Sequence, residues 1–418
     1  MTSTTRILLG LALGAAVGLF LAWFDPAHAA RAVRFAQPVG RLWLNALQMT
    51  VVPLVLALVI IGVSAANDAA ASGRTARRAL VVFALLLAAG AALAAIVAPL
   101  ALSLLPRDPA LIESLREAIP QQGTPAAVGF ADWFTAIIPT NAIAAAAQSA
   151  MLPLVVFALF FGFALTRIDA IRRERMVEFF QAIADTMIVI VQWVLWAAPL
   201  GVFALVLAVC ASAGASVLSA LGWYIALLCA MYITVTVLLY PVAVVFGGTP
   251  LRRFASAILP AQVVAASTQS SLASLPAMVE SARDRLGQPR AVAALVLPMA
   301  VSLFRITSPI QYIGAASFVA WIYGIEVPPA QIAAAAALAV VISLDSVGLP
   351  GQVSFMATTM PVTAAMGLPV APLGLLLAVD TIPDVFATVG NVSADLTASS
   401  IVARTGASDE PPAPERGA

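Results

Sequence analysis

The chain has 418 residues, of which 62% are hydrophobic and only 10% are charged, and its net charge is +1. A soluble domain carries about 25% charged residues because its surface faces water, so this composition excludes a soluble protein and predicts helices that face lipid. The small net charge gives no reason to expect a nucleic-acid partner. At about 20 residues per membrane-spanning helix, the length allows about eight spans and some shorter apolar pieces.

Apolar runs predict helix along nearly the whole chain. The runs that predict spans are 7–24, 42–66, 79–104, 130–165, 176–208, 217–246, 291–323 and 372–403. The first run imitates a signal peptide, but the next span follows within about 20 residues, so we expect a retained first helix. His28 follows this first run, and we expect it in a loop without a metal-binding partner.

Arginines gather between the apolar runs. They occupy 74–78, 167–175, 252–253, 283–290 and position 404. Short arginine-rich loops stay in the cytoplasm. We therefore predict a multi-pass protein of the inner (plasma) membrane with an even number of spans and both termini in the cytoplasm.

Two further apolar stretches, 254–282 and 330–367, are interrupted by small polar residues and proline. The first interruption is 267–276, and the second is 343–351, which includes Asp345. Backbone freed from a helix at membrane depth must be satisfied by protein, water or ligand, so such breaks are typical of a transporter's binding site. We expect two re-entrant hairpins whose polar tips meet near the bilayer centre; two kinked spans are the alternative.

The last apolar run carries five polar side chains on one face. Asp380, Asp384, Thr388, Asn391 and Asp395 project within about 80° of one another at about 100° per residue. A charge at the bilayer centre costs about 2.5–3.5 kcal/mol on insertion scales, so three carboxylates on one face need water, cations or a cationic side chain. This polar stripe predicts a binding cavity along the helix.

Arg305 is the expected cationic partner, because it lies midway along the apolar run 291–323 and keeps its charge in proteins. We expect it to pair with Asp345, Asp384 or Asp395. It contributes either to substrate or ion binding or to a fixed ion pair between two helices, and the sequence leaves both roles open.

Several motifs carry a more specific resemblance. They are Gln48-Met49 to Val52-Pro53, Pro139-Thr140-Asn141, the run Ala-Pro-Leu-Gly-Val-Phe-Ala at 198–204, the serine-rich first hairpin, Val-Gly-Leu-Pro-Gly at 347–351, and Asp384 through Asn391 to Thr397. In this order and spacing they resemble the dicarboxylate/amino acid:cation symporter family, which includes the glutamate transporters. The resemblance implies an all-α membrane protein with eight transmembrane helices plus two re-entrant helical hairpins, which forms a homotrimer and works as an elevator-type transporter.

The resemblance also implies roles for individual residues. Asp384 would hold a substrate ammonium, Asn391 would hold its α-carboxylate, and Asp395 stands where the family binds sodium. A possible residual sodium site at Asn391 and Asp395 therefore remains, and Asp380 is a further candidate for an ion site or charge pair. The remaining residues expected to line or close the pocket are Ser270, Ser271, Ser308, Val347, Gly348, Pro350 and Thr388.

Departures from the family pattern affect the cation sites. The family's Asn-Met-Asp-Gly-Thr on the seventh span becomes Phe-Arg-Ile-Thr-Ser at 304–308, and three oxygen-bearing ligands of the third span become Ala84, Leu87 and Ala88. Hard cations need several oxygen ligands, so we expect one sodium site to be absent and the others to be weakened. The arginine of members that carry acidic substrates is replaced by Ala387, which cannot clamp a second carboxylate.

The family fold divides the chain into scaffold and transport segments. The expected division is 1–78 for scaffold spans 1 and 2, 79–129 for span 3 and an outer loop, 130–250 for scaffold spans 4 and 5 and span 6, 251–290 for hairpin 1, 291–326 for span 7, 327–370 for hairpin 2, 371–404 for span 8, and 405–418 for a disordered tail. Span 3 is expected to belong to the transport domain, which would move as an elevator.

We therefore predict a secondary-active carrier of a small amino acid, neutral rather than acidic, with sodium coupling weakened or lost. Lipid and the small-molecule substrate are its expected partners; no cofactor is expected, and a proton or sodium is the candidate coupling ion. Arg305 either stands in for a bound cation or clamps a substrate carboxylate, which would restore dicarboxylate transport. An ion channel is a remote alternative. We expect no enzyme, since the Gly-x-Gly-Asp of intramembrane aspartyl proteases is missing and His28 is a poor base partner.

Overall fold

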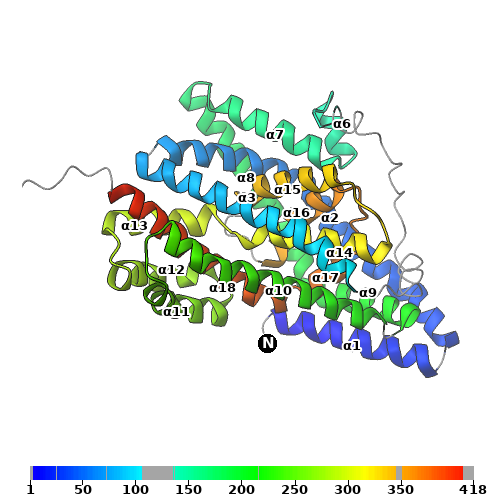
Figure 1. The fold of residues 1–418 in the computed structure, drawn as a ribbon. Coiled ribbons are helices and arrows are strands. Elements are labelled where there is room, and N and C mark those ends of the chain that lie inside the picture. The colour runs from blue at the N-terminus through cyan, green and yellow to red at the C-terminus, as the bar shows by residue number, and fades with distance from the viewer. Residues whose placement is uncertain are drawn as a thin grey trace, which may run out of the picture.

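A computed structural model describes residues 3–24, 26–71, 73–105, 135, 137–214, 216–344 and 351–407 (Figure 1). Every regular element in this part of the chain is a helix. The apolar, lipid-facing composition explains this result, because a helix satisfies all its backbone hydrogen bonds within one segment.

The helices follow the predicted apolar runs. In the first half they are α1 (Ser3–Phe24), α2 (Pro26–Ala71), α3 (Arg74–Ser103), α6 (Ala142–Ala147), α7 (Met151–Leu165), α8 (Ala170–Trp196) and α9 (Ala198–Ala213). In the second half they are α10 (Ser216–Val245), α11 (Leu251–Thr268), α12 (Ser271–Glu280), a π-helical turn (Ser281–Arg285), α13 (Arg290–Leu303), α14 (Thr307–Tyr323), α15 (Pro329–Ser343), α16 (Gly351–Ala365), α17 (Leu373–Val379) and α18 (Thr381–Ala407).

Seven helical segments among the described residues are long and apolar enough to cross a membrane. They correspond to seven of the eight predicted spans. The predicted fourth span appears as the shorter apolar helix α7, preceded by α6. The count of eight spans and the re-entrant character of the hairpins therefore stay predictions.

Several predicted runs are interrupted or extended. The run 176–208 is divided at Ala197 into α8 and α9, because Pro199 lies in the first turn of α9 and cannot continue the preceding helix. The run 291–323 is divided at Phe304–Ile306. The expectation that His28 lies in a loop is wrong, since α2 begins at Pro26, where proline fits the first turn of a helix.

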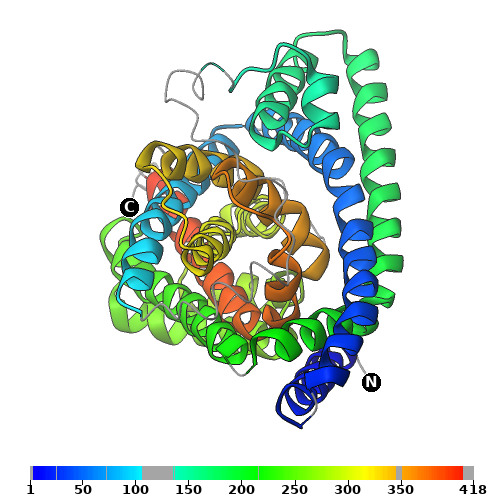
Figure 2. The same cartoon turned by 90° about the vertical axis from the view of Figure 1, so that its right-hand side faces the viewer.

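The helices pack in two groups. Helices α1, α2, α7, α8 and α9 contact one another, whereas α3 and α10–α18 form a second bundle around α14. Figure 2 shows α2 and α8 running along one side of this bundle. Contacts between the groups come mainly from α16, which touches α2, α7 and α8, and from α3 against α2. Helix α10, which falls in the expected segment 130–250 together with scaffold spans 4 and 5, packs in the second bundle, and the division into fixed and moving segments stays a prediction.

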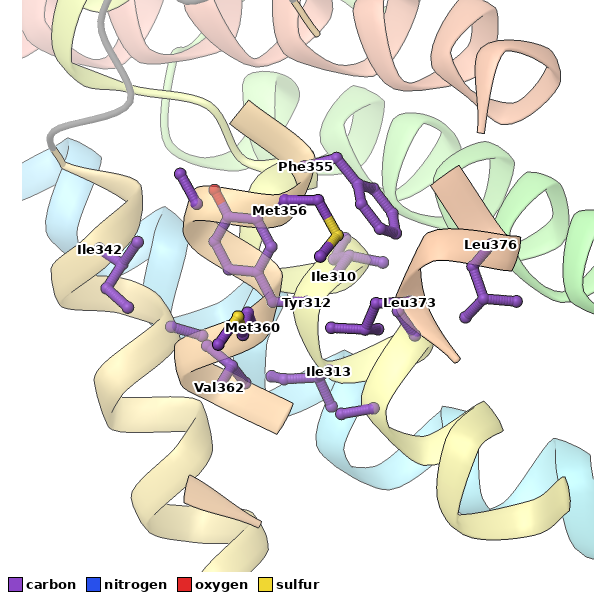
Figure 3. Packing of buried hydrophobic residues seen from close by; sticks show 14 of the residues in the cluster. Ile310, Tyr312, Ile313, Ile342, Phe355, Met356, Met360, Val362, Leu373 and Leu376 are labelled. Atoms are coloured by element: carbon purple, nitrogen blue, oxygen red, sulfur yellow. The ribbon is translucent and has the colours of Figure 1, made fainter. Parts of the chain in front are cut away.

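Helix α14 lies at the centre of the second bundle. All its residues are buried except Gln311, which is half-buried. Apolar side chains of α15, α16 and α17 cover one side of α14, as Figure 3 shows for Ile342, Met356 and Leu373 against Ile310 and Ile313. The helix that follows Arg305 is thus held rigidly by packing on several sides.

The arginine clusters meet at one end of the molecule. Arg78 donates to the backbone oxygen of Thr405 (3.0 Å), and Arg404 donates to that of Val245 (2.7 Å). Arg253 donates to the backbone oxygen of Arg285 (2.9 Å). Segments far apart in the sequence therefore bring their positive charges to a common end, as the loop charges predict.

Helix α1 approaches α9 closely through a row of glycines. A Cβ atom on Gly10 would lie 2.4 Å from the backbone oxygen of Pro199, and one on Gly14 would lie 2.7 Å from that of Phe203. A Cβ on Gly18 would lie 2.8 Å from the backbone oxygen of Leu207. Glycines at this spacing allow two membrane helices to pack backbone to backbone.

We expect Gly14→Ala to destabilise the protein by about 1–3 kcal/mol, because the new methyl group must push α1 away from α9. Thermal unfolding of the detergent-solubilised protein, followed by tryptophan fluorescence, measures the change. Gly222→Ala is the matched control, since its Cβ would meet nothing within 4 Å. Equal melting temperatures for the two variants would refute the close packing.

Candidate functional site

The polar stripe of α18 faces the interior of the second bundle. Asp380, Thr388, Asn391 and Asp395 are at most 5% exposed, and Asp384 is half-buried. Asp384 lies in the first turn of α18, where the positive end of the helix dipole stabilises a carboxylate. The predicted helix face is therefore turned away from lipid, and Asp384 is its most accessible member.

Asn391 is joined to the start of α14. Its side-chain oxygen accepts hydrogen bonds from the backbone nitrogen of Thr307 (3.1 Å) and from the Thr307 hydroxyl (2.9 Å). The break before α14 leaves its first backbone N–H groups without helical partners, and the Asn391 side chain satisfies one of them. This contact fixes the α13–α14 junction (Phe304–Ile306) against the middle of the stripe.

Asp380 lies at the junction of α17 and α18 and is bound by Gln311. The Gln311 side-chain nitrogen donates to both carboxylate oxygens, at 2.8 and 2.9 Å. The backbone nitrogen of Asp384 also donates to the backbone oxygen of Asp380 (3.0 Å), which links the two residues directly. Gln311 thereby fixes the carboxylate one turn before Asp384.

Arg305 lies at the α13–α14 junction and is half-buried. Its backbone lies beside the stripe, because Thr307, two residues further on, is hydrogen-bonded to Asn391. Among the described residues, no carboxylate oxygen lies within 4 Å of its guanidinium. The expected partner Asp345 lies outside the described residues. The guanidinium therefore forms no contact ion pair with Asp384 or Asp395.

The tip of the first hairpin reaches the start of α18. Helix α11 ends at Gln269 in a left-handed conformation (φ 52°, ψ 34°), and the Ser270 side chain caps α12 by accepting from the Ala273 nitrogen (3.2 Å). The Gln269 side chain donates to the backbone oxygen of Thr381 (3.4 Å). The Ser271 hydroxyl is buried and forms no hydrogen bond within the described part of the protein.

Of the other predicted pocket residues, the structure describes Ser308 and Thr388 but not those of the second hairpin. Ser308 is buried in the first turn of α14, and the Thr388 hydroxyl donates to the backbone oxygen of Asp384 (2.9 Å). The predicted second-hairpin residues Val347, Gly348 and Pro350 lie outside the described residues.

Apolar packing fills the contact between α3 and the α13–α14 junction. The rings of Phe83 and Phe304 stack with centroids 4.8 Å apart and an angle of 4° between their planes. Leu87 and Ile306 are also buried, and a Cβ on Gly90 would lie 3.3 Å from a side-chain carbon of Ile306. These side chains offer no oxygen ligand to a cation.

The sequence matches a known protein family along nearly its whole length. A family model described as the sodium:dicarboxylate symporter family matches residues 4–405. The chain belongs to this family. The predicted resemblance is therefore confirmed over nearly the whole chain.

Curated members of the sodium:dicarboxylate symporter family align along most of their length. A proton/glutamate-aspartate symporter of Escherichia coli (strain K12) is 26% identical over 96% of this chain and 92% of its own. The neutral amino acid transporter B(0) of Oryctolagus cuniculus is 30% identical over 94% of this chain and 78% of its own. The C4-dicarboxylate transport protein 2 of Polaromonas naphthalenivorans (strain CJ2) is 25% identical over 93% of this chain and 85% of its own.

These relatives are transporters and not enzymes. With its family and its apolar helices, the chain is a multi-pass membrane protein and a secondary transporter of amino acids or dicarboxylates. The family couples transport to cations, as its description and the name of one member, the proton/sodium-glutamate symport protein of Geobacillus stearothermophilus, state.

Two residues of α14 that hold the polar stripe in place were not identified from the sequence. Thr307 and Gln311 bond Asn391 and Asp380, respectively. They stand four residues apart on α14, so they share a face of that helix. The periodicity that found the stripe on α18 could have found them, had it been applied to the span that contains Arg305.

We expect Gln311→Leu to lower the stability of the protein by about 1.5–3 kcal/mol, because it leaves the buried Asp380 carboxylate without a hydrogen-bond donor. The same substitution should cost much less in an Asp380→Leu background, where no carboxylate needs a donor. Thermal unfolding of the four members of this double-mutant cycle measures the coupling. Additive effects would show that the two side chains do not interact.

Proposed function

We propose that the protein carries a small amino acid across the membrane, with a preference for neutral over acidic substrates. The observation that supports this most directly is the environment of Asp384. It is the half-buried carboxylate of the stripe, and the buried Asn391 lies two turns further along the same face. A carboxylate and an amide at this spacing suit the ammonium and carboxylate of an α-amino acid.

The proposed preference for neutral substrates rests on the lack of a positively charged side chain at position 387, one turn after Asp384 on α18. Ala387 is 6% exposed and provides no positive charge for a second substrate carboxylate. The relative from Oryctolagus cuniculus, whose name states neutral amino acid transport, is 30% identical to this chain. Both observations favour a substrate with one carboxylate.

The substrate pocket is completed by the two hairpin tips. Ser270 and Ser271 stand near the start of α18, since their neighbour Gln269 bonds Thr381. The second tip, with Val347, Gly348 and Pro350, is proposed to close the pocket from the other side, and Ser308 and Thr388 are proposed to line it. Elevator movement of the second bundle along α2 and α8 would then carry the closed pocket across the membrane.

We further propose that sodium is not required. The side chains of Phe83, Phe304, Leu87 and Ile306, all apolar and buried, occupy the contact between α3 and the α13–α14 junction and provide no oxygen ligand. A sodium site needs several oxygens in a fixed cage, and Asn391 already accepts two hydrogen bonds from Thr307. A proton is the remaining candidate for a coupling ion.

A homotrimer in the inner (plasma) membrane is proposed, on the strength of the family membership. The arginine-rich end that joins Arg78 to Thr405 and Arg404 to Val245 is proposed to face the cytoplasm, with both termini.

A second candidate is transport of a dicarboxylate or an acidic amino acid. It is favoured by Arg305, which makes no contact ion pair with a described carboxylate and could clamp a second substrate carboxylate bidentately. The relative from Polaromonas naphthalenivorans is named as a C4-dicarboxylate transport protein. An ion channel is a third, remote candidate, which saturation of flux with substrate would exclude.

Asp384→Asn should weaken binding of a neutral amino acid by about 30-fold or more, because the substrate ammonium loses its charged partner in a site shielded from water. Equilibrium binding of radiolabelled amino acids to the purified protein measures this. Asp169→Asn, an exposed position at the start of α8, is the control. Unchanged affinity in a folded Asp384→Asn variant would indicate a substrate without an amine.

Replacing external sodium by choline should leave the initial rate of amino acid uptake into proteoliposomes unchanged, since the described part of the chain offers no oxygen cage between α3 and α14. Uptake of a labelled neutral amino acid with and without an inward sodium gradient tests this. A steep dependence of the rate on sodium would contradict the proposal.

A further inference from the structure

The α13–α14 junction holds Arg305 by the residues on either side of it. Phe304 is extended (φ −136°, ψ 111°), and its buried ring stacks on Phe83. Ile306 is buried against Gly90 of α3, and Thr307 is bonded to Asn391. The Arg305 backbone is therefore fixed at the level of Asn391, whereas its side chain is only half-buried.

The guanidinium is shared between two carboxylates that it cannot contact together. Asp384 and Asp395 are separated by about 16 Å along the axis of α18, at about 1.5 Å per residue. A contact ion pair needs an N···O distance of about 4 Å or less. Because Asn391 lies between the two carboxylates, a side chain rooted beside it can approach either one.

Asp395 is the member of the stripe that most needs a positive charge. It is 0% exposed, and neither of its carboxylate oxygens has a hydrogen-bond partner in the described structure. The neighbouring polar side chains of α18 do have hydrogen-bond partners. The Ser393 hydroxyl donates to the backbone oxygen of Val389 and accepts from the Gln262 side-chain nitrogen, and the Thr397 hydroxyl donates to the backbone oxygen of Ser393. An ionised carboxylate in such surroundings is strongly unfavourable unless a cation is near.

Other ionisable groups do not meet this need. The ionisable side chains of α3, α11, α12 and α13 lie within the first or last five residues of their helices, and α10 brings the phenols Tyr232 and Tyr240 towards α18. The π-helical turn carries Arg283, Asp284 and Arg285, of which Arg283 and Asp284 pair with each other. The described residues contain no cluster of three metal-ligating side chains. Arg305, two residues before the Thr307 that bonds Asn391, is the arginine that the fold roots beside the middle of the stripe.

We propose that Arg305 is a built-in counter-cation for Asp384 and Asp395, held permanently in the place of a co-transported metal ion. In the empty carrier the guanidinium balances both carboxylates; when a substrate ammonium neutralises Asp384, the guanidinium turns to Asp395. The cation that members of this family take from solution is thus part of this chain. The inference rests on the proposed function in taking the stripe as the substrate site, but its test needs no substrate.

The test compares the melting temperature of purified wild-type protein and Arg305→Met in sodium and in choline chloride of equal ionic strength, from pH 5 to pH 8. The wild type should show no sodium effect. Removing the guanidinium leaves the charge of Asp395 unbalanced. The melting temperature of Arg305→Met should therefore rise by about 2 °C or more when sodium is added or the pH is lowered, because binding of either ion stabilises the folded protein. Arg172→Met, at an exposed arginine of α8, should show neither effect.

Two further variants keep the test decisive if Arg305→Met folds poorly. Arg305→Lys preserves the charge and should remain insensitive to sodium. Arg305→Met with Asp395→Asn removes both charges, so it should be more stable than Arg305→Met and should lose the new dependence. A double variant no more stable than Arg305→Met would overturn the proposal, as would an Arg305→Met protein that responds to neither ion.

A sodium effect in the wild type that disappears in Asp395→Asn would also overturn it, because sodium would then still reach this carboxylate. If Arg305 instead clamps a substrate carboxylate, succinate or aspartate should raise the melting temperature of the wild type and not that of Arg305→Met. If, in addition, the melting temperature of Arg305→Met depended on neither sodium nor pH, both the role of Arg305 as a counter-cation and the preference for a neutral substrate would be refuted. A counter-cation confirmed in a protein that binds no amino acid would refute the proposed function alone.

Discussion

Three carboxylates, one at the α17–α18 junction and two on one face of α18, are the constraint on which the second bundle depends. Ionised groups at membrane depth need donors or positive charges, and each of the three aspartates meets that need differently. Asp380 is bonded by Gln311, Asp384 is half-buried in the first turn of α18, and Asp395 has no hydrogen-bond partner among the described residues. Because Asp384 is the carboxylate that is not fully enclosed, it is the one that we propose to bind a ligand.

The break between α13 and α14 connects the stripe to the rest of the bundle. It exposes the first backbone N–H groups of α14, and Asn391 accepts from the Thr307 nitrogen at 3.1 Å. The same break places Arg305 opposite the stripe and the stacked Phe83 and Phe304 rings behind it. One interruption of a helix thus combines a polar contact on the substrate side with a dry, apolar contact on the α3 side.

Much of this could be predicted from the sequence. Composition and apolar runs gave the helical membrane class, motif order gave the family, and the 100° periodicity of α18 found a face that the structure buries. The break at 304–306 was not predicted, because Phe304 and Ile306 are apolar residues without glycine or proline, and the helix ends there through long-range contacts with Asn391 and Phe83. The positions of Thr307 and Gln311 on one face of α14 were open to the same periodicity argument, but their partners were not, since hydrogen bonds between residues 84 and 69 positions apart leave no local pattern.

A structure of the protein in lipid nanodiscs, determined by cryo-electron microscopy with a neutral amino acid in sodium-free buffer, tests the central claim most directly. The account predicts ligand density whose amino end meets the Asp384 carboxylate and whose carboxylate lies towards Asn391, with the Arg305 side chain turned to Asp395. Ligand density away from the α18 stripe, or an Arg305 side chain bound to a substrate carboxylate, would contradict it.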